Sequence, residues 1–189
     1  MKLTGTVRRA TGVVRRMDEL GRIVVPKEIR RTMRIREGDP LEIFTQREEI
    51  IFKKYSPIGE LAVFAGEYAE TLHKTCALSV VICDRDAVIA TAGVPRKEYA
   101  DKMLSEEMER ILEGRALFVQ REGDAPVYPT SEGGGMSVRC AMPILAEGDI
   151  VGCVCSLGGE EENKKAPSID VEIKLIQTAA GFLGRQLEN

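Results

Sequence analysis

The sequence has few cysteines, and their spacing is not that of a disulfide framework. Its 189 residues contain five, namely Cys76, Cys83, Cys140, Cys153 and Cys155. A small disulfide-stapled secreted protein would need an even number at tight, regular spacing. There is no Cys-x-x-Cys pair and no histidine near Cys153 and Cys155. We therefore predict buried thiols there, with a metal site as the alternative, and expect neither a metal nor a cofactor.

A secretory signal is absent as well. The opening Met1-Lys2-Leu3 has neither a basic n-region nor the apolar segment that a signal peptide needs. This absence predicts a cytoplasmic protein. No local motif in the later part of the chain points to catalysis, so we do not expect an enzyme.

The chain has no large net charge, its formal value being −3, but its N-terminal and C-terminal parts carry charges of opposite sign. The first 55 residues hold 14 Lys and Arg against 8 Asp and Glu, whereas residues 56–189 hold 13 against 22. A basic N-terminal part indicates a surface for nucleic acid or for an acidic partner. The alternative is a solvated loop or arm that binds nothing.

The N-terminus contains a near-repeat. Residues 4–10 read TGTVRRA and residues 11–17 read TGVVRRM, so the glycine and the arginine pair keep their places. The pattern indicates a small internal duplication that places an extra short strand or loop ahead of a folded unit. A chance similarity between two stretches of common residue types is the alternative.

The segment after the repeat predicts a strand and then a helix. Residues 18–26 (DELGRIVVP) mix small, polar and apolar side chains and end in proline. Proline cannot donate to a sheet ladder, so we predict a short strand that ends at Val25. The charged and apolar side chains from Lys27 to Arg31 predict a short amphipathic helix, with Arg30 and Arg31 on a common side.

The later part of the chain has a different pattern. Beyond residue 58, apolar residues recur about every three to four positions, which predicts an amphipathic helix. We expect one buried face formed by Leu61, Val63, Phe64 and Leu72. The spacing in residues 182–187 predicts a C-terminal helix, and residues 60–189 predict a larger unit with its own helices and strands.

The repeat and the DELGRIVVP run together resemble the swapped-hairpin bacterial transition-state regulators of the AbrB/SpoVT type. The resemblance covers residues 4–36. It implies dimerisation through an exchanged N-terminal β-hairpin and DNA recognition through clustered arginines. It also implies that Arg15, Arg22, Arg30 and Arg31 contact DNA, with Arg8 and Arg9 as secondary positions. The family motif is expected once, so its appearance twice is a departure.

These observations predict a chain of two parts. Residues 1–36 form a small β-rich DNA-binding unit with a possible swapped hairpin, and residues 37–189 form a larger mixed α/β domain to which no function is assigned. The resemblance implies a dimeric, DNA-binding transcription regulator whose partners are DNA and a second copy of the chain. The alternative is a cytosolic protein with a basic tail that binds an acidic partner other than DNA.

Overall fold

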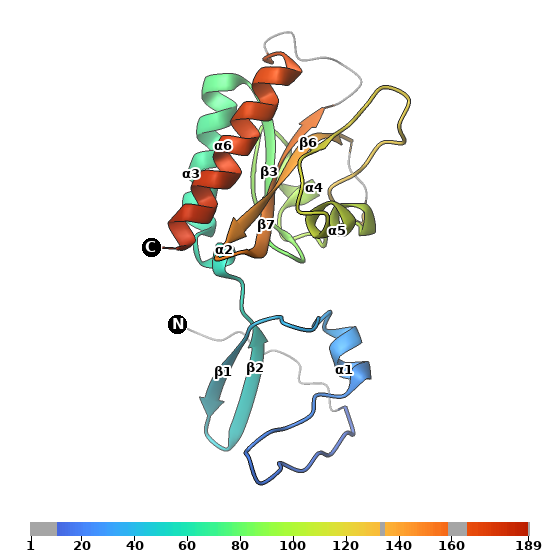
Figure 1. The fold of residues 1–189 in the computed structure, drawn as a ribbon, viewed down its shortest axis with the longest axis vertical. Helices are drawn as coiled ribbons and strands as arrows, with labels where there is room; N and C mark the ends of the chain where they lie inside the picture. The colour runs from blue at the N-terminus through green and yellow to red at the C-terminus, as the bar shows by residue number, and fades with distance from the viewer. Residues whose placement is uncertain (1–10, 133–134, 159–165, 189) are drawn as a thin grey trace. The chain divides into compact units, whose positions relative to one another are not determined.

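The computed structural model describes residues 11–132, 135–158 and 166–188. The chain divides into two compact units, Met1–Asp39 and Pro40–Asn189, which are described separately (Figure 1). A two-stranded hairpin precedes an α/β domain built on a five-stranded sheet. This arrangement confirms the expected fold class, a small β-rich N-terminal part followed by a larger mixed α/β domain.

The described part of the N-terminal unit, residues 11–39, contains one short helix, α1 (Lys27–Thr32), which confirms the helix predicted after Pro26. The prediction of a strand ending at Val25 is wrong for the single chain, because residues 11–26 form no strand. A strand exists only where a neighbouring strand completes its hydrogen-bond ladder. Among the described residues of one chain, nothing pairs with this segment. Its apolar side chains are left exposed, with Val24 at 73%.

The hairpin consists of β1 (Leu41–Gln46) and β2 (Glu49–Lys54), which pair in antiparallel fashion across a two-residue loop. The register places Ile43 opposite Phe52 on one face and Phe44 opposite Ile51 on the other. Successive side chains of a strand point to opposite faces. Apolar side chains therefore lie on both faces of this hairpin.

The larger domain begins with two helices that follow the hairpin closely. They are α2 (Pro57–Glu60) and α3 (Ala62–Cys76). A five-stranded antiparallel sheet follows, in the order β4-β3-β7-β6-β5. Its strands are β3 (Ser79–Cys83), β4 (Val88–Ala92), β5 (Phe118–Val119), β6 (Ser137–Ala146) and β7 (Asp149–Gly158). The remaining helices are α4 (Arg96–Tyr99), α5 (Glu106–Glu113) and α6 (Ile169–Leu187).

Each face of the sheet has its own core. Figure 1 shows α3 and α6 on one face and α4 and α5 on the other. Side chains of α3 and α6 pack with alternate residues of β3, β6 and β7, whereas Tyr99 and Met108 pack on the opposite residues of those strands. Successive side chains of the central strands therefore point alternately to the two helical layers.

The thiols predicted to be buried are buried. Cys153 and Cys155 are fully buried on the α5 side of the sheet, with their Sγ atoms 3.6 Å apart. Cys83 lies opposite Cys153 on the neighbouring strand. No cluster of metal-binding side chains was found in the part of the chain that the structure describes.

The helix predictions held except at one residue. Helix α3 covers the predicted helical residues except Leu61, which is its N-cap, and α6 includes residues 182–187 but begins much earlier. Leu72 is buried, and Leu61 and Phe64 pack against the core. Val63 was predicted to be buried and is 80% exposed, because it lies on the outer side of α3. No helix among the described residues has the length and apolar character needed to span a membrane.

Candidate nucleic-acid interface

A tight turn organises the N-terminal unit. Gly21 N donates to Asp18 O and Asp18 N donates to Arg22 O, each at 3.0 Å. Gly21 has φ +75, a conformation that L side chains rarely adopt, so glycine suits this position. The Asp18 carboxylate completes the turn, because Oδ1 accepts from Leu20 N at 3.0 Å and from Arg22 N at 2.8 Å. The sequence DELGR therefore folds as a turn that is closed from within by its own aspartate.

The same carboxylate orients the Arg22 side chain. Arg22 Nε donates to Asp18 Oδ2 at 2.7 Å, while the guanidinium side chain stays 71% exposed. The Arg22 backbone N–H, followed by the Arg22 side chain, lowers the pKa of Asp18 below its ordinary value of 3.8. The carboxylate is thus ionised at neutral pH. Within the described residues the Nη groups of Arg22 make no hydrogen bond, so they are available to an acceptor.

Arg30 and Arg31 lie in the last turn of α1, and both are exposed. The helix begins after Pro26, whose carbonyl accepts from Arg30 N at 3.0 Å. Proline suits a helix N-terminus, since it cannot donate and its φ is already helical. Cationic side chains near a helix C-terminus interact favourably with the helix dipole. The sequence PKEIRR therefore forms a short helix that presents two arginines to solvent.

Helix α1 ends in a left-handed residue that is an arginine rather than the usual glycine. Ile35 N donates to Arg30 O at 2.7 Å and Arg34 N donates to Arg31 O at 3.2 Å. These are the two hydrogen bonds of a Schellman ending, in which the residue after the cap adopts positive φ. Arg34 has φ 51. The ending thereby adds a third exposed arginine just beyond the pair on α1.

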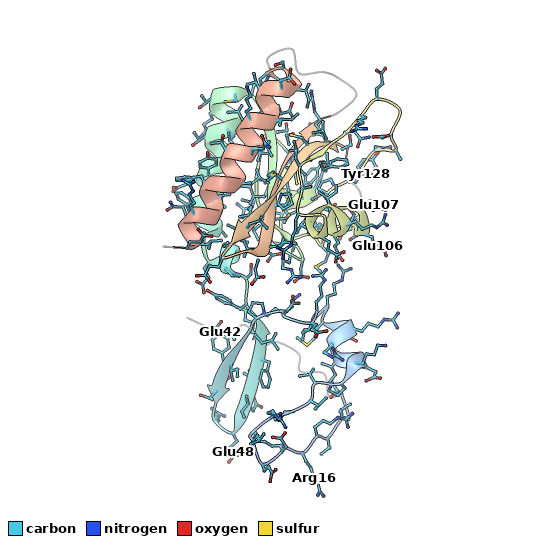
Figure 2. All side chains as sticks on the ribbon, in the orientation of Figure 1. Arg16, Glu42, Glu48, Glu106, Glu107 and Tyr128 are labelled. Atoms are coloured by element: carbon cyan, nitrogen blue, oxygen red, sulfur yellow. The ribbon has the colours of Figure 1, made fainter. Side chains whose placement is uncertain are left out.

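The structure places the predicted contact residues in one unit and adds others. Arg15, Arg22, Arg30 and Arg31 are all exposed in the unit Met1–Asp39. Arg8 and Arg9, with the first copy of the repeat, lie outside the described residues. The prediction did not include four further basic residues in the described part of the unit, namely Arg16, Lys27, Arg34 and Arg36. Figure 2 shows the Arg16 side chain extending away from its own segment.

Charge count alone would have pointed to these additional residues. Residues 11–39 hold eight Lys and Arg against five Asp and Glu. Exposed guanidinium groups bind phosphate oxygens through a planar fork of N–H donors. A surface of this kind can neutralise several phosphates along a nucleic-acid backbone.

The hairpin and the N-terminal unit also leave many large apolar side chains exposed. On the hairpin, Ile43 is 61% exposed and Ile50 is 54% exposed, and Phe44 on the other face is 40% exposed. A two-stranded hairpin is at best marginally stable in water without further packing. Large exposed apolar patches mark sites of protein association.

Two family models match this chain. The model described as "Stage V sporulation protein T C-terminal, transcription factor" matches residues 60–188. The model described as "Antidote-toxin recognition MazE, bacterial antitoxin" matches residues 14–60. Together the matches extend over both the basic unit and the α/β domain.

The chain is similar to two curated proteins of Bacillus subtilis (strain 168). It is 47% identical over 181 residues to stage V sporulation protein T, covering 95% of this chain and 99% of the relative. It is 38% identical over 104 residues to the transition state regulatory protein AbrB, covering 54% of this chain and 93% of the relative. The two names refer to sporulation and to transition-state regulation.

Solved structures match the two ends of the chain separately. A solution structure of the N-terminal DNA recognition domain of Bacillus subtilis AbrB is 56% identical, covering 25% of this chain and 91% of that chain, with a TM-score of 0.23. A crystal structure of a methyl-accepting chemotaxis protein, residues 122 to 287, is 17% identical, covering 68% of this chain and 91% of that chain, with a TM-score of 0.50. The second likeness concerns the fold of the α/β domain alone.

Proposed function

We propose a DNA-binding role for the N-terminal unit of this chain, which belongs to the stage V sporulation protein T family and is therefore a transcription regulator. The DNA-contacting segment lies within residues 1–36. Arg15, Arg22, Arg30 and Arg31 contact the phosphate backbone, and Arg8 and Arg9 contribute from the first copy of the repeat. The matching N-terminal domain of AbrB is a DNA recognition domain, and its 56% sequence identity supports this assignment by analogy.

The observation that carries the proposal is the fixed presentation of Arg22. Its Nε is held by Asp18 at 2.7 Å, so the guanidinium is oriented before any ligand arrives. A side chain that is already ordered loses less conformational entropy on binding. A positively charged but unstructured tail would have no such contact.

We further propose that the active species is a homodimer formed by exchange of N-terminal segments. The support is the apolar surface described above, which includes both faces of the hairpin and the segment ending at Val25. A second copy would supply a strand partner for the extended segment Ile23–Val25 that follows the Asp18 turn, and would cover Ile43 and Phe44. Burial of such side chains favours association by about 25 cal/mol per Å² of apolar surface.

A salt titration of DNA binding by the full chain tests the DNA-binding role. The logarithm of the binding constant should fall linearly with the logarithm of salt concentration, because bound phosphates release counterions. Arg22→Ala should weaken binding and reduce this slope by about one unit. Arg121→Ala, at an exposed position of the larger domain, serves as the matched control and should leave the slope unchanged. Absence of binding at low salt would contradict the proposal.

Sedimentation equilibrium of the full chain tests the homodimer. The wild-type protein should sediment as a dimer or a multiple of one, and Ile43→Asp should shift it toward the monomer. Arg47→Asp places the same carboxylate at the hairpin loop, where the positive φ of 55 tolerates aspartate, and should leave the assembly intact. A monomeric wild type would overturn the proposal.

The competing function is binding of an acidic protein through the basic unit. It predicts retention of an acidic protein partner and no mobility shift of a DNA oligonucleotide at any salt concentration. A guanidinium fork binds carboxylates as well as phosphates, so the mobility shift decides between the two functions.

A further inference from the structure

A shielded ion pair joins the hairpin to the sheet of the larger domain. Nζ of Lys54, the last residue of β2, donates to Oδ2 of Asp86 in the loop between β3 and β4. Only 22% of the Lys54 side chain and 20% of the Asp86 side chain are exposed. Salt screens a shielded pair less than a fully exposed one. The contact is tertiary, because the two residues are 32 positions apart in the sequence.

The loop that carries Asp86 is held in place by its own hydrogen bonds. Asp84 Oδ1 accepts from the backbone N–H groups of Asp86 and Ala87, each at 2.8 Å. On the other side, Leu104 N donates to Asp86 O at 2.9 Å. The next residue, Ser105, is the N-cap of α5. The position of Asp86 is therefore tied to the start of α5.

The chain that follows Lys54 reaches the core at once. Only Tyr55, Ser56 and Pro57 separate it from Ile58, which is fully buried on the α3 and α6 side of the sheet. Tyr55 N donates to Pro40 O at 3.0 Å, so the two ends of the hairpin are joined to each other. The base of the hairpin is thus joined to the core through the chain and to the β3–β4 loop through the Lys54–Asp86 ion pair.

We propose that Asp86 is a positioning residue for DNA binding. Through Lys54 it fixes the direction in which the hairpin leaves the larger domain, and it links that direction to the loop that leads into α5. The inference rests on the proposed function, in which the hairpin belongs to the DNA-binding dimer. A change in the packing of α5 would be transmitted to the hairpin through the contacts between Leu104, Asp86 and Lys54.

The direction in which Asp86→Asn changes DNA affinity distinguishes a positioning role from a simple charge effect. Asp86→Asn removes a negative charge, so by long-range electrostatics alone it should strengthen DNA binding. If Asp86 positions the hairpin, the same change weakens binding instead, because the released hairpin must be ordered again in the complex. We expect a loss of about threefold to tenfold in affinity for the full chain at constant salt. Unchanged or strengthened binding overturns the proposal.

Five further variants isolate the pair. Lys54→Ala should weaken binding more than Lys53→Ala, which removes the same charge from the neighbouring position. The exchanged pair, Lys54→Asp with Asp86→Lys, should recover most of the affinity lost by Lys54→Asp alone. Glu132→Gln breaks an ion pair of the same domain, in which Lys102 Nζ lies 2.5 Å from Glu132 Oε2, and should leave DNA binding unchanged.

Hydrogen exchange of the full chain gives a readout that does not depend on DNA. Asp86→Asn should speed exchange of the backbone amides of β1 and β2 and leave those of β6 and β7 unchanged. If the wild type binds no DNA, the proposed function fails, and the exchange rates still test the positioning role. If the wild type binds DNA and Asp86→Asn changes neither affinity nor hairpin exchange, only the positioning role fails.

Discussion

Arg139 Nε lies 3.4 Å from Glu172 Oε2, and the Glu172 side chain is 1% exposed. Among the described residues, neither carboxylate oxygen of Glu172 has a hydrogen-bond partner, so Arg139 is the principal compensation for a buried charge. A register shift in β6 between Val138 and Cys140 falls at Arg139, whose side chain meets Glu172 of α6. Bulges of this kind redirect single side chains.

Removal of Arg139 should therefore be costly. Arg139→Met leaves the Glu172 charge uncompensated and should lower the free energy of unfolding by about 3 kcal/mol, as measured by urea denaturation. The double variant Arg139→Met with Glu172→Met replaces both charges and should recover most of that stability. A double variant no more stable than Arg139→Met would contradict this account of the pair.

Two glycines of α6 should respond to alanine in opposite ways. A Cβ at Gly184 would lie 2.2 Å from the backbone oxygen of Leu145, whereas a Cβ at Gly181 meets nothing within 4 Å. Gly184→Ala should destabilise the domain by about 1–3 kcal/mol through overpacking. Gly181→Ala should stabilise it by about 0.5–1 kcal/mol, because alanine is the better helix former. Thermal unfolding of the two variants compares them directly, and equal effects would be inconsistent with this packing.

The cysteines should differ sharply in reactivity. Burial raises the pKa of Cys140 to about 11 and raises that of Cys153 well above its ordinary value. Hydrogen bonds from the Cys153 and Cys155 thiols lower the pKa of Cys83 to about 5, but its side chain is fully buried, so reagents cannot reach it. A thiol reagent should modify only Cys76 quickly in the native protein, and all five thiols after denaturation.

The Asp18 turn should open in acid. Because the pKa of Asp18 is lowered in the folded chain, its contribution to stability is present above the ordinary value of 3.8 and is lost as the pH falls below it. An NMR titration should show the carboxyl of Asp18 and the Nε–H of Arg22 shifting together below that pH. Asp18→Asn should abolish the coupled shift. Independent titration of the two groups would argue against the contact.

The sequence predicted the parts of the fold that depend on local pattern. The Lys27–Arg31 helix and the α3 and α6 helices follow from spacing and from proline, which act over a few residues. Val63 was misjudged because it lies about 200° around the helix from Leu61 and so does not share its face. The segment ending at Val25 was judged extended, but a ladder depends on a partner that the local sequence does not specify.

The candidate site was predictable in composition but not in geometry. A run of arginines identifies the basic unit, and Asp18 with Gly21 has the spacing of a turn, which could have located the Arg22 contact. The Lys54–Asp86 pair could not have been found this way. It joins residues that become neighbours only after the sheet has formed.

The positive φ at position 34 limits which residues can replace Arg34 during evolution. Its φ of 51 costs about 1–2 kcal/mol for an ordinary L residue, and β-branched side chains fit this conformation worst. Glycine would remove that cost but would also remove a positive charge from the basic unit. Selection at this position therefore balances the cost of a positive φ against the loss of a positive charge. Lysine is the substitution that keeps the charge without introducing a β-branched side chain.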